Sequence, residues 1–167
     1  KKYGFNFIEY FGERKFNKNN PIWNKKNLKE INSLVKRNNL SSYSFCDDFF
    51  INKNLITYKN FEKYYEKIIE NLSIIDIKVY VLALFEKSLI TKKNFNHFIK
   101  RIEYISNKLK NKNIKLALET NLDVQFIDKL LRQIGSKNTY IVYDTGNRLK
   151  KKNLQYKEII GLKKYIC

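Results

Sequence analysis

A chain of 167 residues with 43% hydrophobic content can bury the core of one domain, and it shows neither a bilayer-spanning apolar run nor a signal peptide. Its formal charge of +18 comes from dispersed lysines, with an excess of Asn, Ile, Tyr and Phe, the residues that AT-rich codons encode. Because arginine, the preferred residue for bidentate contacts to bases and phosphates, is scarce, the composition predicts no specific nucleic-acid partner and no membrane partner.

Taken in chain order, short apolar runs typical of strands alternate with segments in which apolar residues recur with the helical period. Strands are predicted at residues 5–10, 42–46, 77–85, 114–118 and 139–143. Helices are predicted between them, with apolar positions centred on residues 28–35, 61–72, 98–109 and 124–134. This regular βα repeat predicts a parallel sheet with right-handed crossovers.

A doubly wound sheet and a (β/α)₈ barrel both fit this repeat. No glycine-rich loop follows any strand, so the dinucleotide fingerprint and the phosphate-binding loop are absent, and the barrel is favoured. The predicted fold is therefore α/β, a partial (β/α)₈ TIM barrel of about five βα units that forms a single incomplete domain over residues 1–167. The sequence contains no methionine, even at position 1, and we expect it to be the N-terminal fragment of a longer polypeptide.

Carboxylates lie at or just past the end of every predicted strand, although acids are the minority charge in this chain. They are Glu9, Asp47, Glu86, Glu119 and Asp144. The carboxyl ends of parallel strands meet at one rim of the sheet, where α/β proteins keep their active sites. Like charges gathered there repel one another unless a cation or a proton is present. A divalent metal with oxygen ligands meets that need.

Structural roles remain open for several of these acids. Glu9 and Glu86 also fit solvated loop residues, and the Asp47-Asp48 pair also fits the cap of a turn. The lone His97 begins a predicted helix, away from any strand end, and is interpreted as a surface or packing residue. The two cysteines, Cys46 and Cys167, have neither metal-ligand spacing nor a disulfide framework, which is typical of a cytoplasmic protein.

The functional interpretation is stronger for Glu119 and Asp144. The helix after Glu119 can be capped by Thr120, Asn121 or Asp123, which leaves the Glu119 carboxylate free. Gly146 permits a tight turn that aims Asp144 and Asn147 inward. We therefore predict that Glu119 and Asp144 share a metal or catalytic site.

Two motifs carry a resemblance to a known family. The segment Leu116-Ala-Leu-Glu119-Thr-Asn, followed by Tyr143-Asp-Thr-Gly-Asn147, resembles the sugar phosphate isomerase/epimerase family of the xylose isomerase-like TIM barrel superfamily. Supporting matches lie in Ser42-Tyr-Ser-Phe-Cys-Asp47 and Leu84-Phe-Glu-Lys-Ser88. The resemblance spans nearly the whole chain, and its specificity comes from the order and spacing of short motifs.

The resemblance implies that Glu119 is a metal ligand and one of two acid/base carboxylates, and that Asp144 is a second ligand. The family's other ligands, a His near strand six and a Glu on strand eight, have no counterpart here. The segment 158–166 resembles the lead-in to strand six. Many relatives carry a His shortly after the strand-five Asp, where this chain has Asn147.

The resulting hypothesis is a metal-dependent isomerase or epimerase that acts on a sugar or sugar phosphate by proton transfer next to a polarised carbonyl, with Glu119 as the catalytic residue. The cofactor would be a divalent ion: Mn, Mg, Co or Zn. Glu9, Asp47, Glu86 and Asn147 are candidate substrate contacts, and Lys87 and Arg148 are candidates to bind a phosphate. The alternatives are a metal-dependent phosphodiesterase resembling apurinic-site endonucleases, which use more His ligands, and a non-catalytic degenerate barrel.

Overall fold

The structure is a computed structural model that describes residues 4–148 and 155–167. Five parallel strands form one sheet in the order β1-β2-β3-β4-β5, so each strand pairs with its neighbours in the sequence. The strands are β1 (Phe7–Gly12), β2 (Ser41–Asp47), β3 (Val79–Ala83), β4 (Lys115–Glu119) and β5 (Thr139–Val142). This order is that of consecutive strands in a (β/α)₈ barrel, and the predicted partial barrel is confirmed.

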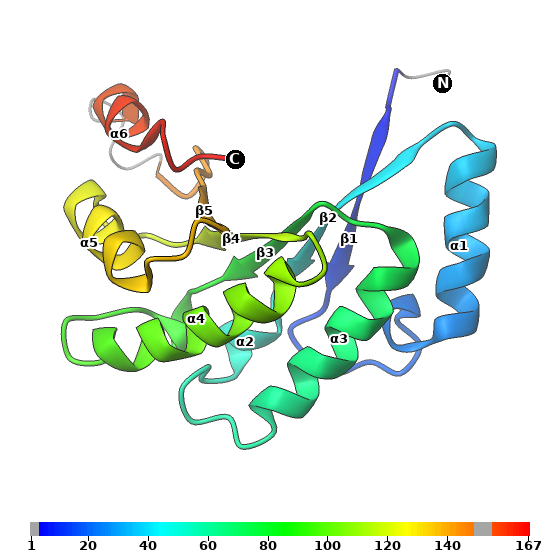
Figure 1. The fold of residues 1–167 in the computed structure, drawn as a ribbon, viewed down its shortest axis with the longest axis horizontal. Helices are drawn as coiled ribbons and strands as arrows, with labels where there is room; N and C mark the ends of the chain where they lie inside the picture. The colour runs from blue at the N-terminus through cyan, green and yellow to red at the C-terminus, as the bar shows by residue number, and fades with distance from the viewer. Residues whose placement is uncertain (1–3, 149–154) are drawn as a thin grey trace.

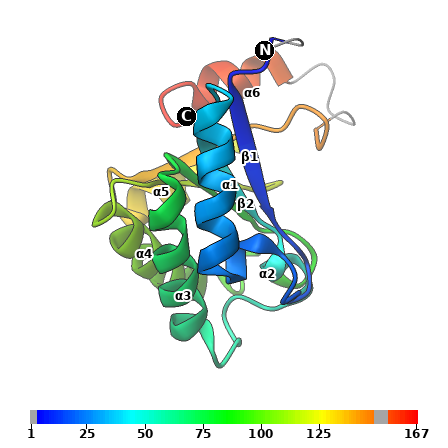
Figure 2. The same cartoon turned by 90° about the vertical axis from the view of Figure 1, so that its right-hand side faces the viewer.

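The helices between the strands lie along one side of the sheet (Figures 1 and 2). The longer ones are α1 (Lys25–Arg37), α3 (Phe61–Ile75), α4 (Phe95–Lys110) and α5 (Val124–Ile134). The chain also forms the short helices α2 (Phe49–Asn52) and α6 (Gln155–Leu162) and the 3₁₀ turns η1 (Pro21–Trp23) and η2 (Glu86–Ser88). Within the described ranges, no helix is long and apolar enough to cross a membrane.

Side chains alternate between the two faces of each strand, and the two faces differ in size and chemistry. The helix-covered face carries the main core, with large buried side chains such as Phe45, Tyr80 and Leu118. The opposite face, the inner face of the barrel, carries a small cluster of Val79, Val81 and Ala117, against which Cys46 and Val142 pack. All five residues of β3 are consequently buried.

The end of the described chain lies along the free edge of β5. After α6, an isolated parallel bridge joins Ile166 to Ile141. The amide of Ile141 donates to the carbonyl of Tyr165 at 2.9 Å, and the amide of Cys167 donates to the carbonyl of Ile141 at 3.4 Å. Residues 165–167 thus occupy the position where the next parallel strand of a barrel lies.

Candidate active site at the carboxyl ends of the strands

The ends of β4 and β5 bring Glu119, Asp144 and Asn147 together. Glu119 is the last residue of β4, and its Oε1 accepts a hydrogen bond from Asn147 Nδ2 at 2.7 Å. Asp144 follows β5, and its Oδ1 accepts the amide N–H groups of Gly146 at 2.7 Å and of Asn147 at 3.4 Å. A tight turn therefore places the Asn147 amide against the Glu119 carboxylate.

Electrostatics at this pair disfavour two full negative charges. Partial burial raises the pKa of Glu119, the charges of Asp144 and Asp48 raise it further, and the hydrogen bond from Asn147 lowers it. Across residues 4–148 and 155–167, no Lys or Arg forms an ion pair with Glu119 or Asp144. Glu119 Oε2 likewise has no hydrogen-bond partner in this part of the chain.

The inner face of the sheet forms a pocket of about 220 Å³ beside Glu119. Its lining includes the side chains of Glu9, Ser44, Cys46, Val81 and Glu119. The Glu9 carboxylate accepts a hydrogen bond from the Ser44 hydroxyl, so it is held on this face. Asp144 does not line the pocket. The structure thus brings Glu9 and Glu119 to one cavity, with Asp144 beside Glu119.

The ends of β2 and β3 carry a second group of acids, which is paired with a cation. Arg14 Nε lies 3.8 Å from Asp48 Oδ2, and Arg14 Nη1 donates to Glu86 Oε1 at 2.9 Å. The Cys46 thiol donates to Asp48 Oδ1 at 3.6 Å. Burial raises the pKa of Asp48, and the Cys46 hydrogen bond and the Arg14 charge oppose that shift. The sequence analysis missed Arg14, whose only signal was its place in the loop after the first strand.

Lys87 lies in η2, beside Glu86, with an exposed side chain. Its backbone carbonyl accepts a hydrogen bond from Asn54 Nδ2 at 3.0 Å. The neighbouring Ser88 is buried, and its hydroxyl donates to the carbonyl of Lys53 at 2.8 Å. These contacts anchor the loop after β3, in which Glu86 pairs with Arg14 and the Lys87 side chain is exposed.

Asp47 does not join the acids at the rim. Its carboxylate points to the helix side, where Oδ1 accepts the Tyr64 hydroxyl at 2.8 Å and the Phe49 amide at 3.1 Å, and Oδ2 accepts the Tyr80 hydroxyl. Burial raises its pKa to about 6, against the lowering effect of these hydrogen bonds. A fully buried carboxylate offers no surface to a substrate, so we replace the expected substrate contact with a structural role.

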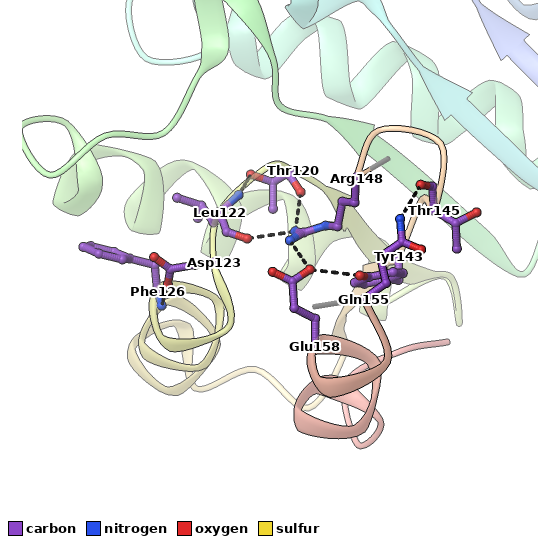
Figure 3. A network of polar contacts seen from close by, with 9 residues as sticks. All are labelled: Thr120, Leu122, Asp123, Phe126, Tyr143, Thr145, Arg148, Gln155 and Glu158. Atoms are coloured by element: carbon purple, nitrogen blue, oxygen red, sulfur yellow. Dashed lines mark hydrogen bonds and ion pairs between the residues drawn. The ribbon is translucent and has the colours of Figure 1, made fainter. Parts of the chain in front are cut away.

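Arg148 is also buried, which corrects the expectation that it binds a phosphate. Arg148 Nη1 donates to Glu158 Oε2 at 2.9 Å, and Nη2 donates to the carbonyls of Thr120 at 3.0 Å and Leu122 at 2.8 Å. Its guanidinium also lies over the Tyr143 ring, 5.0 Å from the centroid (Figure 3). With these partners satisfied, the side chain supports the loops around the site and is not offered to a ligand.

The donors present suit part of a metal shell. The Glu119 and Asp144 oxygens are hard ligands of the kind that Mg²⁺ and Mn²⁺ prefer, and their mutual repulsion would be relieved by a cation. Among the described residues, no group of three or more His, Cys, Asp or Glu side chains could hold a metal ion. His97 is exposed on α4 and lines a groove with Phe61 of α3, so it is not a candidate ligand here.

A parallel sheet of consecutive βα units, with free carboxylates at the ends of adjacent strands, defines this chain as part of an α/β barrel of the TIM type. A sequence profile of the Xylose isomerase-like TIM barrel family matches residues 1–166, so the chain belongs to that family. No curated protein matches the chain.

Several solved structures share the fold at low sequence identity. A xylose isomerase domain protein from Planctomyces limnophilus has a TM-score of 0.79 and 8% identity, with 99% of this chain and 63% of that protein covered. A D-psicose 3-epimerase with D-tagatose from Clostridium cellulolyticum H10 has a TM-score of 0.78 and 15% identity, with 99% and 62% covered. A xylose isomerase-like TIM barrel protein from Mycobacterium smegmatis, in complex with magnesium, has a TM-score of 0.70 and 11% identity, with 98% and 60% covered. The chain therefore spans less than two thirds of the length of these neighbours.

Proposed function

We propose that this chain contributes the β4 and β5 carboxylates of a metal-dependent isomerase or epimerase that acts on a sugar or sugar phosphate. The observation that carries the proposal is the Glu119–Asn147–Asp144 arrangement, in which two carboxylates meet at adjacent strand ends without a cationic partner in the described chain. Family membership and the epimerase among the structural neighbours support the same class of reaction.

Glu119 is the residue that we assign to proton transfer. Its Oε1 is held by Asn147, so Oε2 is the oxygen left to accept the proton from the carbon next to a sugar carbonyl. The upward shift of its pKa makes the carboxylate a better proton acceptor than an ordinary solvated glutamate. Glu9, on the same inner face, is placed to accept hydrogen bonds from sugar hydroxyl groups.

Glu119 and Asp144 would hold part of the metal shell, and further ligands would be needed to complete it. A bound divalent ion (Mn, Mg, Co or Zn) supplies polarisation of the carbonyl oxygen. Asp144 is already oriented by the amides of Gly146 and Asn147, which leaves Oδ2 as its free oxygen in the described chain. Asn147 orients Glu119, so the turn after β5 presents both carboxylates.

The test uses the full-length protein in which this sequence occurs. Ketohexoses, including D-tagatose and D-fructose, and ketose phosphates are incubated in D₂O with each metal, and deuterium at the carbon next to the carbonyl is measured together with product. Glu119→Gln keeps the side-chain size but removes the proton acceptor, and it should lower turnover by at least roughly 10²-fold. Asp144→Asn should mainly weaken metal activation.

Glu66→Gln provides the matched control, because Glu66 is an exposed acid of α3 that pairs with Lys108 at 3.5 Å on the helix layer. It should leave turnover unchanged. If no sugar exchanges deuterium with any metal, or if Glu119→Gln retains turnover within about threefold of wild type, the proposal is wrong.

A further inference from the structure

The loops that carry the two carboxylates are tied together by one side chain. Arg148 belongs to the turn after β5, directly after Asn147, yet its Nη2 donates to the carbonyls of Thr120 and Leu122 in the loop after β4. Figure 3 shows the guanidinium lying between these two loops. Glu119 directly precedes Thr120, and Asp144 lies in the same turn as Arg148. The Arg148 side chain therefore links the two backbone segments that carry the carboxylates.

A third element, α6, contacts the same side chain. Glu158 of α6 accepts Arg148 Nη1 and the Tyr143 hydroxyl, each at 2.9 Å. The side chains of Arg148 and Glu158 are only 4% and 9% exposed. Tyr143 directly precedes Asp144, and its ring lies beneath the Arg148 guanidinium. Both ends of the turn 143–148 are consequently fixed to the same buried ion pair.

The buried Arg148–Glu158 ion pair is not expected to add much to the free energy of unfolding. Replacing a buried ion pair with uncharged groups of similar size is often neutral or stabilising, because both charges must be removed from water. What this pair does is tie the loop after β4 to the turn after β5, the two segments that carry the Glu119 and Asp144 carboxylates. Two like charges at adjacent strand ends disfavour each other until a cation is present. An external restraint is what a repelling ligand pair needs in order to be ready for a cation.

We propose that Arg148 and Glu158 are positioning residues that hold Glu119 and Asp144 at the separation in which they bind a divalent cation. This inference rests on the proposed function and deepens it, since it assigns control of the metal site to the docking of α6. Partners that orient metal ligands typically contribute 10- to 100-fold to metal affinity. We expect a loss of roughly that size when the restraint is removed.

The experiment compares the full-length wild-type protein with the double variant Arg148→Met, Glu158→Gln. Changing both residues removes the Arg148–Glu158 pair as a unit, and the carbonyls of Thr120 and Leu122 lose their donor. The matched control is Lys25→Met with Glu70→Gln, which removes an exposed ion pair between α1 and α3. Hydrogen exchange of each backbone segment, Mn²⁺ affinity by calorimetry, and kcat and KM are measured for all three proteins.

The double variant should exchange faster in residues 119–123 and 143–148 and bind Mn²⁺ roughly 10- to 100-fold more weakly. The control should match the wild type. Unchanged exchange in those two segments, or Mn²⁺ affinity equal to the wild type, would overturn the inference. If the wild-type protein itself binds no Mn²⁺, the proposed function fails first, so the two failures are distinguishable.

Tyr143→Phe keeps the test decisive if the double variant does not fold. This change removes only the hydroxyl bond to Glu158 and leaves the ring beneath Arg148. It should weaken Mn²⁺ binding in the same direction but by less than about 10-fold. An affinity equal to that of the wild type would count against the restraint.

Discussion

Strands β2 and β4 both end in a carboxylate, but the two acids have opposite environments. Asp47 is fully buried and accepts three hydrogen bonds, two of them from tyrosine hydroxyls. Glu119 is partly exposed, accepts one hydrogen bond from Asn147, and lies among other acids. The difference shows that the face to which the last strand residue points decides whether a strand-end acid supports the core or faces the pocket.

Removing the buried acid should have the largest effect on stability. Asp47→Ala leaves the hydroxyls of Tyr64 and Tyr80 and the amide of Phe49 without their acceptor, and each unsatisfied buried donor costs about 1–3 kcal/mol. We expect the free energy of unfolding to fall by about 3–5 kcal/mol in urea denaturation. Asp48→Ala, at the next and more exposed position, is the control and should cost less. A loss below about 1 kcal/mol for Asp47→Ala would remove the contrast between the two strand ends.

The pH dependence of stability tests the same contrast without changing the packing. Burial raises the pKa of Asp47 from 3.8 to about 6 in the folded protein, so between these values the folded state holds a proton that the unfolded state has lost. This contribution to stability is present in full below about pH 4 and is lost as the pH rises through about 6, a change of about 3 kcal/mol. Asp47→Asn should abolish it. The measurement is the unfolding free energy at pH 4 and pH 7 for both proteins, and a contribution that grows with pH would contradict the assignment.

The smallest expected effect on stability comes from the pocket acid. Glu119→Gln removes a charge that Asp144, Asp48 and Glu9 disfavour, so the unfolding free energy should rise slightly. Solvent screening limits the gain to about 0.5 kcal/mol or less. Thermal denaturation at low ionic strength measures it, with Glu66→Gln as the exposed control. A clear destabilisation would show that Glu119 supports the fold in the way that Asp47 does.

The fold could be predicted from the sequence because the patterns that indicate strands and helices are local. Apolar runs and helical periodicity lie within single segments, and the prediction of five strands and their parallel order is confirmed. The N-cap of α5 is a further local signal: of the three predicted candidates, Thr120, Asn121 and Asp123, it is Asp123 that accepts a hydrogen bond from the Phe126 amide.

The environments of the acids could not be predicted from the sequence, because their hydrogen-bond partners are distant along the chain. The tyrosines that bind Asp47 lie 17 and 33 residues away, and no local pattern connects them to it. Arg148 resembles an exposed cation in a polar turn, and its burial depends on carbonyls 26 and 28 residues earlier. For Glu119, by contrast, the prediction of a free carboxylate depended on capping residues that directly follow it in the sequence, so a local pattern was enough.

The strand order has a consequence for how the chain is made. From β2 to β5, each strand pairs with the strand that precedes it in the sequence, so each of these pairings can form once the next βα unit has been synthesised. Domains fold from the N-terminus as they emerge during synthesis. On the ribosome, each new βα unit therefore adds to an edge that already exists, as Ile166 does at β5.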